Sequence, residues 1–233
     1  MFRELLNEWS GVWHHFPDYP PSQLILLGTG FILWVAAYYF IIKGVRKWKI
    51  VEIPMVVVAL DIGWEFDWAF LLKSDLGLIF NIGCAVWFFM DIFINIYTLK
   101  YGKKLVTNNA IKKYYNYIYL FILIGGALLT FFMKETAEDN GLGIVSAYLI
   151  NIMISSLYLY QLVTFPELRG KGFSYLVGWL KGLGTGAITI AVYLHWSHNP
   201  FLITICTVVL IMDIIYLYLY KNYKPELLQE NAV

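Results

Sequence analysis

The sequence predicts an all-α membrane protein: a seven-transmembrane-helix bundle with an N-terminal amphipathic helix at the membrane interface. Hydrophobic residues make up 60% of the 233 residues and charged residues 14%, whereas soluble domains contain about 45–50% apolar and about 25% charged residues. The mean hydropathy is +0.63. The apolar residues form long continuous runs, and a helix crosses the hydrocarbon core of a bilayer in about 20 residues. These observations indicate a polytopic membrane protein.

Seven apolar runs are candidate spans, and together they occupy most of the chain. They are residues 23–42, 53–72, 76–98, 114–133, 142–163, 174–195 and 200–220. We therefore expect an interfacial helix and linker over residues 1–22, a seven-helix domain over 23–220 and a tail over 221–233. The connections between the runs are short, so whatever chemistry the protein performs is expected within the helices.

Residues 1–16 differ from the spans, because polar residues alternate with apolar residues at helical spacing. A helix of this pattern is too polar to cross the bilayer and lies in its interface. Pro17, Pro20 and Pro21 then end the helix. The helix can serve as an anchor, which is the ordinary use of such helices, or as a lid over a cavity mouth. The apolar positions are Phe2, Leu5, Leu6, Trp9, Trp13 and Phe16.

Lysine and arginine residues predict the orientation of the bundle. The segments after the first, third, fifth and seventh runs hold thirteen of them, and the opposite side holds Arg3, Lys73 and Lys134. Basic residues concentrate on the cytoplasmic side of membrane proteins, which places the N-terminus outside and the C-terminus in the cytoplasm. The net charge is +1, so the chain lacks the basic footprint of a nucleic-acid-binding protein.

Small residues predict close helix packing in the sixth run. Gly178, Gly182 and Gly186 recur at four-residue intervals, with Gly184 between them. Glycines at this spacing let helix backbones approach closely in membranes. A ligand lying against bare backbone is the alternative interpretation.

Ionisable side chains inside spans cost about 2.5–3.5 kcal/mol each and by default mark function. Three of them can be accommodated without a functional role. Asp67 can reach water at the outer end of its span, and Asp91 can pair with a loop lysine. Lys181 can extend toward the membrane surface or pair with an acid. The remaining acids are Asp61, Glu65 and Asp213.

Asp61 and Glu65 are four residues apart and therefore lie on one helix face. The spans place Glu65 and Asp213 at a vertical offset of roughly 8 Å, so these two carboxyls can face one cavity from two helices. Burial favours the neutral form of a carboxyl group, which can protonate an epoxide or an alkene. The resulting carbocation needs a dry site and aromatic faces. The aromatic residues in the acid-bearing runs include Trp64, Trp68, Trp87, Phe88 and Phe89. On these residues alone, the acids can either protonate a lipid or relay protons.

Three features resemble a known family: "DIGWEF" at 61–66, "WFFMD" at 87–91, and Asp213 near the middle of the last run. The chain resembles the small integral-membrane terpene cyclases of fungal meroterpenoid and indole-diterpene pathways, which have bacterial relatives. The resemblance covers the whole chain and implies a catalytic domain over 23–220. The family often has asparagine four residues before the glutamate, where this chain has Asp61.

The resemblance implies a membrane-bound cyclase, of isomerase or lyase type, that protonates a terminal epoxide or alkene of a prenyl chain and drives cationic ring closure. The prenyl chain can be attached to an aromatic head group. Glu65 is implied as the proton donor, with Asp213 assisting protonation or steering the cation, and Asp61 beside them. We expect the residues that stabilise the substrate or its cation to be Trp64, Trp68, Trp87, Phe88 and Asp91.

We expect no metal or other cofactor. The sequence has no DDxxD or NDxxD pattern of the kind that holds Mg²⁺ and a diphosphate, and no DxDD acid motif. The cysteines fall inside spans, where small packing residues are the ordinary interpretation. Histidines in membrane-surface loops are ordinarily interfacial, and a metal site needs further ordered ligands. These side chains are Cys84, Cys206, His14, His15, His195 and His198.

Three alternative functions remain compatible with an acid-bearing helical bundle. A proton-coupled transporter would use the same acids as a relay, although the sequence shows no internal repeat of the kind common in transporters. A lipid or sterol double-bond isomerase would also protonate an alkene in a membrane cavity. A retinal protein would need a Schiff-base lysine in the last run, where this chain has Asp213.

Overall fold

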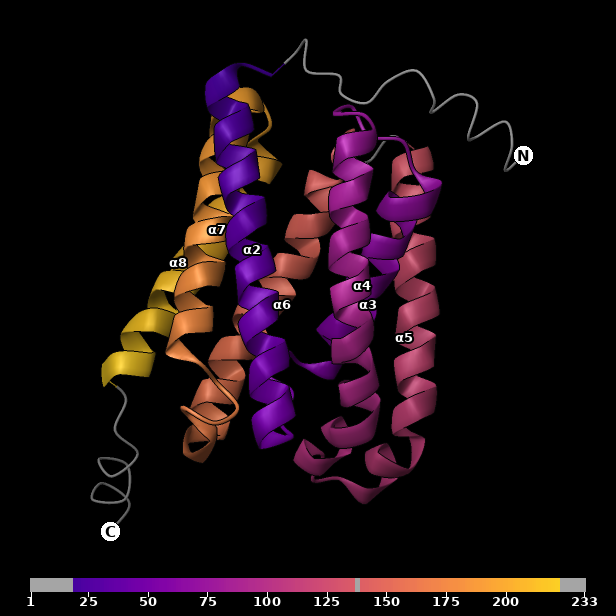
Figure 1. Ribbon diagram of the computed structural model, residues 1–233, viewed down its shortest axis with the longest axis vertical. Helices are drawn as coiled ribbons and strands as arrows, with labels where there is room; N and C mark the ends of the chain where they lie inside the picture. Colours follow the sequence, from indigo (N-terminus) through magenta and orange to yellow (C-terminus); the bar gives the residue numbers. More distant parts are fainter. Residues whose placement is uncertain (1–18, 137–138, 223–233) are drawn as a thin grey trace.

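The computed structural model describes residues 19–136 and 139–222, and the long elements in these ranges are helices that run roughly along one direction (Figure 1). The α-helices are α2 (Pro21–Trp48), α3 (Met55–Phe66), α4 (Leu78–Tyr101), α5 (Asn109–Glu135), α6 (Ile144–Thr164), α7 (Tyr175–His195) and α8 (Pro200–Asn222). A π-helix, η1 (Asp67–Leu71), follows α3, and the 3₁₀ helices η2 (Gly102–Leu105) and η3 (Pro166–Leu168) follow α4 and α6. The prediction of an all-α fold is confirmed. The predicted interfacial helix over residues 1–16 lies outside the described residues.

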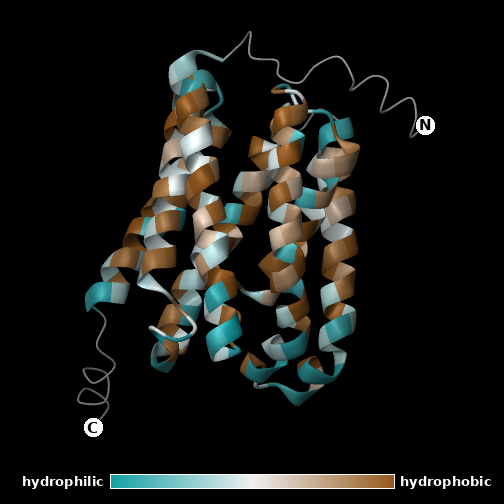
Figure 2. Cartoon of the chain, in the orientation of Figure 1, coloured by the Kyte–Doolittle hydropathy of each residue, from teal (hydrophilic) through white to brown (hydrophobic). Residues whose placement is uncertain are grey.

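Six of these helices are long and apolar enough to cross a bilayer, namely α2, α4, α5, α6, α7 and α8. Hydrophobic residues cover the middle of the bundle (Figure 2). The predicted span 53–72 is different. It forms α3, whose 12 residues extend about 18 Å at 1.5 Å per residue, and continues as the wider η1. The structure therefore has six candidate spans and one shorter segment, where the sequence predicts seven similar spans.

A polar side chain of α4 stabilises the wide turn of the π-helix η1 by hydrogen bonds to its backbone. The N–H of Leu72 donates to the carbonyl of Asp67 at 2.8 Å, a bond across five residues. The buried Asn81 amide donates to the carbonyls of Trp68 and Leu72, the latter at 2.8 Å. Asn81 thus satisfies backbone groups that the regular α-helical pattern would otherwise use. Such π-bulges occur frequently beside functional sites.

The helices form two groups with α6 between them (Figure 1). In one group α7 packs against α2 and α8, and in the other α3 packs against α4 and α5. A Cβ added at Gly30 of α2 would lie 2.9 Å from the carbonyl oxygen of Gly184, and one at Gly178 would lie 2.6 Å from the Tyr216 ring of α8. The predicted packing role of the α7 glycines is confirmed at Gly178 and Gly184. A cavity lies in the interior between the two groups.

Candidate active site

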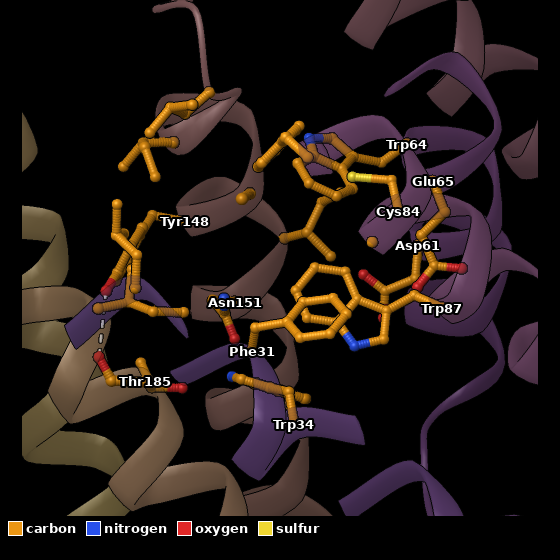
Figure 3. A pocket seen from close by; sticks show the side chains of 18 of the residues that line it. Phe31, Trp34, Asp61, Trp64, Glu65, Cys84, Trp87, Tyr148, Asn151 and Thr185 are labelled. Carbon is orange, nitrogen blue, oxygen red and sulfur yellow. Dashed lines mark hydrogen bonds between the residues drawn. The ribbon is translucent and has the colours of Figure 1, made fainter. Parts of the chain in front are cut away.

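A cavity of about 460 Å³ lies between the two helix groups (Figure 3). Its walls come from α2, α3, α4, α6 and α7, and most of the lining side chains are apolar. This volume falls within the range of about 300–1,000 Å³ that is usual for small-molecule sites. The residues that matter most for chemistry are Phe31, Trp34, Tyr38, Asp61, Trp64, Glu65, Cys84, Trp87, Asn151 and Thr185.

Asp61 and Glu65 both line the cavity from one face of α3, as their spacing predicts. Glu65 is only 2% exposed. The Tyr38 hydroxyl of α2 donates a hydrogen bond to Glu65 Oε1 at 3.3 Å. Glu65 Oε2 is buried and has no hydrogen-bond partner among the described residues. Tyr38 therefore holds one oxygen of the Glu65 carboxyl group in place, while the other oxygen makes no hydrogen bond to the described residues.

Aromatic rings surround this acid pair. Trp87 of α4 packs against Phe31 of α2 with ring centroids 4.7 Å apart, and Figure 3 shows Trp87 beside Asp61. Trp34 lies one turn before Tyr38 on α2, with centroids 6.1 Å apart. Rings placed in this way present π-faces that attract a cation.

Trp64 is fixed by a polar network at the start of α6. Its indole Nε1–H donates to Ser146 Oγ at 2.8 Å. Ser146 in turn bonds to the carboxylate of Asp139, which also accepts the N–H of Val145 at 2.9 Å. Asp139 thus satisfies free backbone groups at the helix start and anchors the side chain that orients Trp64.

Two of the predicted aromatic residues do not line the cavity. Trp68 is fully buried behind it. The Trp68 ring lies 6.1 Å from that of Trp64 and fills the space beside Gly143, where a Cβ would lie 2.5 Å from the indole. Phe88 packs against Phe70 at 5.3 Å on the other side of α4. Trp68 on η1 and Phe88 on α4 therefore lie outside the cavity lining, and only Trp68 packs against a lining ring.

Asp213 is in an ion pair with Lys181 and is not among the residues that line the cavity. Ser155 Oγ donates to Asp213 Oδ1 at 2.7 Å, and Lys181 Nζ lies 2.7 Å from Ser155 Oγ. This cluster joins α6, α7 and α8. The structure therefore does not bring Asp213 to Glu65 across one cavity, because its position on α8 turns it toward α7. The expected pairing of Lys181 with an acid is confirmed.

Asp91 and Asp67 differ from their predicted surroundings. Asp91 is 1% exposed, and both of its carboxyl oxygens lack a hydrogen-bond partner in the part of the chain that the structure describes. The pairing of Asp91 with a loop lysine is therefore wrong. Asp67 is 2% exposed rather than in contact with water, because η1 turns it inward. Asp91 does not line the cavity, although it lies within electrostatic range of Glu65.

Several lining residues were missed at the sequence level. Phe31, Trp34 and Tyr38 recur at helical spacing on α2, and this aromatic stripe was a usable signal. Asn151 and Thr185 are two of several scattered polar residues of α6 and α7, and they form no pattern that marks them as lining residues. Asn151 Oδ1 and Thr185 Oγ1 are both buried without a hydrogen-bond partner among the described residues.

The remaining candidate ligands lie apart from one another. Both cysteines are free and buried, and Cys84 faces the cavity. His195 bonds to Gln23 at 3.0 Å. Within the described ranges, no group of three histidine, cysteine or acidic side chains could hold a metal ion.

Comparison with known proteins shows that this chain matches the model of one protein family. The model of the Pyr4-like transmembrane terpene cyclases matches residues 14–225. Two relatives from Penicillium brasilianum, the terpene cyclases ausL and prhH, are each 26% identical over 168 residues, which cover 71% of this chain and 67% of each relative. No solved structure matches.

Proposed function

Because the chain belongs to the Pyr4-like transmembrane terpene cyclases, we propose that it cyclises a prenyl chain by protonating its terminal epoxide or alkene with the Glu65 carboxyl. The family and the apolar helices make the protein a multi-pass membrane protein of a terpenoid-cyclising family. The observation that supports the finer proposal is the Asp61 and Glu65 pair, which opens into an aromatic, largely apolar cavity.

The reaction is an isomerisation whose atoms balance without a further reactant. The neutral Glu65 carboxyl gives its proton to the epoxide oxygen or to an alkene carbon. In the epoxide case one C–O bond breaks, the oxygen becomes a hydroxyl and a carbocation forms. The π electrons of neighbouring alkenes then form the new C–C bonds. Loss of a C–H proton next to the last cation forms an alkene and returns one proton to the protein. Asp61, one helical turn away, offers the second carboxyl that can accept it.

The aromatic walls stabilise the cation as it moves along the chain. Trp64, Trp87 and Phe31 line the cavity beside the acids, and an aromatic face within about 6 Å attracts a cation by about 0.5–2 kcal/mol. Trp68 contributes by packing against the lining rings of Trp64 and Phe80. The mostly apolar lining disfavours water, which would otherwise capture the cation before the rings close.

Asp213 and Asp91 act from outside the cavity in this proposal. Asp213 holds Lys181, whose Nζ lies 6.0 Å from the centroid of the Trp34 ring. Lys181 is also within electrostatic range of Asp61. Asp213 is thus a positioning residue: it holds the Lys181 ammonium group behind the cavity wall that Trp34 forms. Asp91 is buried within electrostatic range of Glu65 and does not line the cavity.

A polar head group on the substrate fits the wall opposite the acids. Asn151 and Thr185 line this part of the cavity, where Figure 3 shows them away from Asp61 and Glu65. Their free oxygens can accept a hydrogen bond, and an unpaired buried polar group costs about 1–3 kcal/mol. A hydroxyl or N–H on the head group would satisfy them and direct the far end of the prenyl chain toward the acids.

Product analysis tests this function. We expect membranes that contain the protein to convert an epoxidised prenyl substrate into a cyclic isomer of identical mass. In D₂O, alkene protonation would add one non-exchangeable deuterium to the product, whereas epoxide protonation would place the deuterium on an exchangeable hydroxyl. A shifted double bond without a ring would favour the isomerase alternative, and transport of unchanged substrate across liposomes would favour a transporter. Substrate that binds but yields no ring would refute the proposal.

A further inference from the structure

We propose that the substrate enters the cavity sideways from the bilayer, through a lateral opening between α2 and α4 that is bordered by Gly28 and Ile79. The terpenoid chain as occupant rests on the function proposed above. The opening itself rests on separate observations about these two helices.

The two rims of the opening belong both to the cavity wall and to the outside of the bundle. Gly28 lines the cavity, is exposed, and a Cβ added there would meet nothing within 4 Å. Ile79 also lines the cavity and is 53% exposed. These exposed lining residues indicate an opening between α2 and α4, near the end of the bundle at which α2 begins (Figure 1).

The surface around the opening faces hydrocarbon. Ile25 and Ile32 flank Gly28 on α2 and are each 67% exposed, and Ile82 follows Ile79 on α4 at 45% exposed. Gly28 lies seven residues into α2, about 10 Å from its start at 1.5 Å per residue. A prenyl chain dissolved in the bilayer leaflet nearer the start of α2 can therefore reach the cavity without passing through water.

The inner edge of the opening is a pair of rings. Phe31 and Trp87 bridge α2 and α4 with centroids 4.7 Å apart. The Phe31 ring occupies space that Gly83 leaves free, since a Cβ at Gly83 would lie 2.9 Å from it. Beyond these rings lie Asp61 and Glu65. A chain that enters end-first would pass the ring pair and bring its terminus to the acids.

Carbene labelling tests the opening without requiring turnover. The protein is reconstituted in liposomes that contain a bilayer-dissolved aryl diazirine, which is photolysed, and the inserted label is mapped by mass spectrometry. Lipid-facing residues of α4 such as Ile82 lie in the same peptide, so the label is located residue by residue from fragment ions, and we expect it on the cavity-lining side chains of Cys84 and Trp87. Gly28→Phe is expected to reduce this labelling about tenfold, a difference worth about 1.4 kcal/mol. Tyr117, 74% exposed on α5, is the internal control and should be labelled equally in all variants.

Gly44→Phe is the matched control, because Gly44 is also on α2 with nothing within 4 Å of a Cβ but does not line the cavity. This variant should keep the labelling of the wild-type protein. Ile79→Trp narrows the opposite rim and should reduce cavity labelling as Gly28→Phe does. Equal labelling of the Cys84 and Trp87 side chains in the Gly28→Phe, Ile79→Trp and wild-type proteins would overturn the proposal.

Kinetics then separates this proposal from the proposed function. If the wild-type protein makes cyclic product, Gly28→Phe should lower kcat/KM about tenfold relative to Gly44→Phe, which corresponds to slower access of substrate. If the wild-type protein makes no cyclic product, the proposed function fails, while the labelling result still decides whether the opening exists.

Discussion

Asp213→Asn is expected to destabilise the protein strongly, because Asp213 neutralises a buried lysine. Asp213 and Lys181 have side chains 5% and 4% exposed, and Ser155 bonds to both of them. Asparagine keeps the shape of the side chain but removes its charge, so the Lys181 ammonium would be buried without a counter-ion. Breaking a buried ion pair in this way costs about 3–5 kcal/mol.

The size of this effect can be checked with a double-mutant cycle. Lys181→Met alone and Asp213→Leu alone should each cost a similar amount, since each leaves one buried charge of the pair unpaired. The combined variant Lys181→Met with Asp213→Leu should recover most of the loss, because apolar replacement of a whole buried pair is often neutral or stabilising. The coupling free energy should therefore be large and favour the paired state.

The assay is unfolding in mixed micelles by added dodecyl sulfate, followed by tryptophan fluorescence. If Asp213→Asn keeps a free energy of unfolding within about 1 kcal/mol of the wild-type protein and yet abolishes cyclisation, the reasoning is refuted. That outcome would mean that Asp213 takes part in the chemistry directly rather than through Lys181.

Three further predictions concern Glu65, the loop before α3 and the topology. Tyr38→Phe removes the hydrogen bond to Glu65 and should lower kcat about tenfold, since such a bond contributes about 1–1.5 kcal/mol; an unchanged kcat would remove Tyr38 from the site. Burial raises the pKa of Glu52 from 4.5 to about 8, so the folded state holds a proton that the unfolded chain has released. Stability should then fall as pH rises from about 5 to about 8, and Glu52→Gln, which keeps an oxygen for the N–H of Ser174, should flatten this dependence in pH-dependent unfolding. A tag fused after Val233 should be cleaved by protease only when the cytoplasmic side is accessible; cleavage from the outside would contradict the proposed orientation.

The α3 acids show how much of the site the sequence could predict. The four-residue spacing of Asp61 and Glu65 determines that they share a helix face, and the cost of burying them indicates that this face has a function. Both lie in the cavity wall. The intrinsic geometry of one helix is enough for this prediction, and no knowledge of packing is needed.

Relations between helices were harder to predict. Depth along the membrane suggested that Asp213 could face Glu65, but rotation of α8 about its own axis depends on packing against α6 and α7, and it directs Asp213 to Lys181. The polar residues of α6 and α7 are scattered around both helices and give little amphipathic signal, so Asn151 and Thr185 could not be assigned to a cavity wall. The π-helix η1 depends on Asn81 of α4, a contact between segments that local sequence does not encode.

The most direct test of the central claim compares Glu65→Gln with Glu135→Gln. Glu135 is exposed at the end of α5, so both variants remove one carboxyl with the same chemical change. With the protein in bilayers and an epoxidised prenyl substrate, Glu65→Gln should bind substrate and form no cyclic product, while Glu135→Gln should cyclise it at the wild-type rate. Cyclic product from Glu65→Gln at a rate near that of the wild-type protein would contradict the assignment of Glu65 as the proton donor.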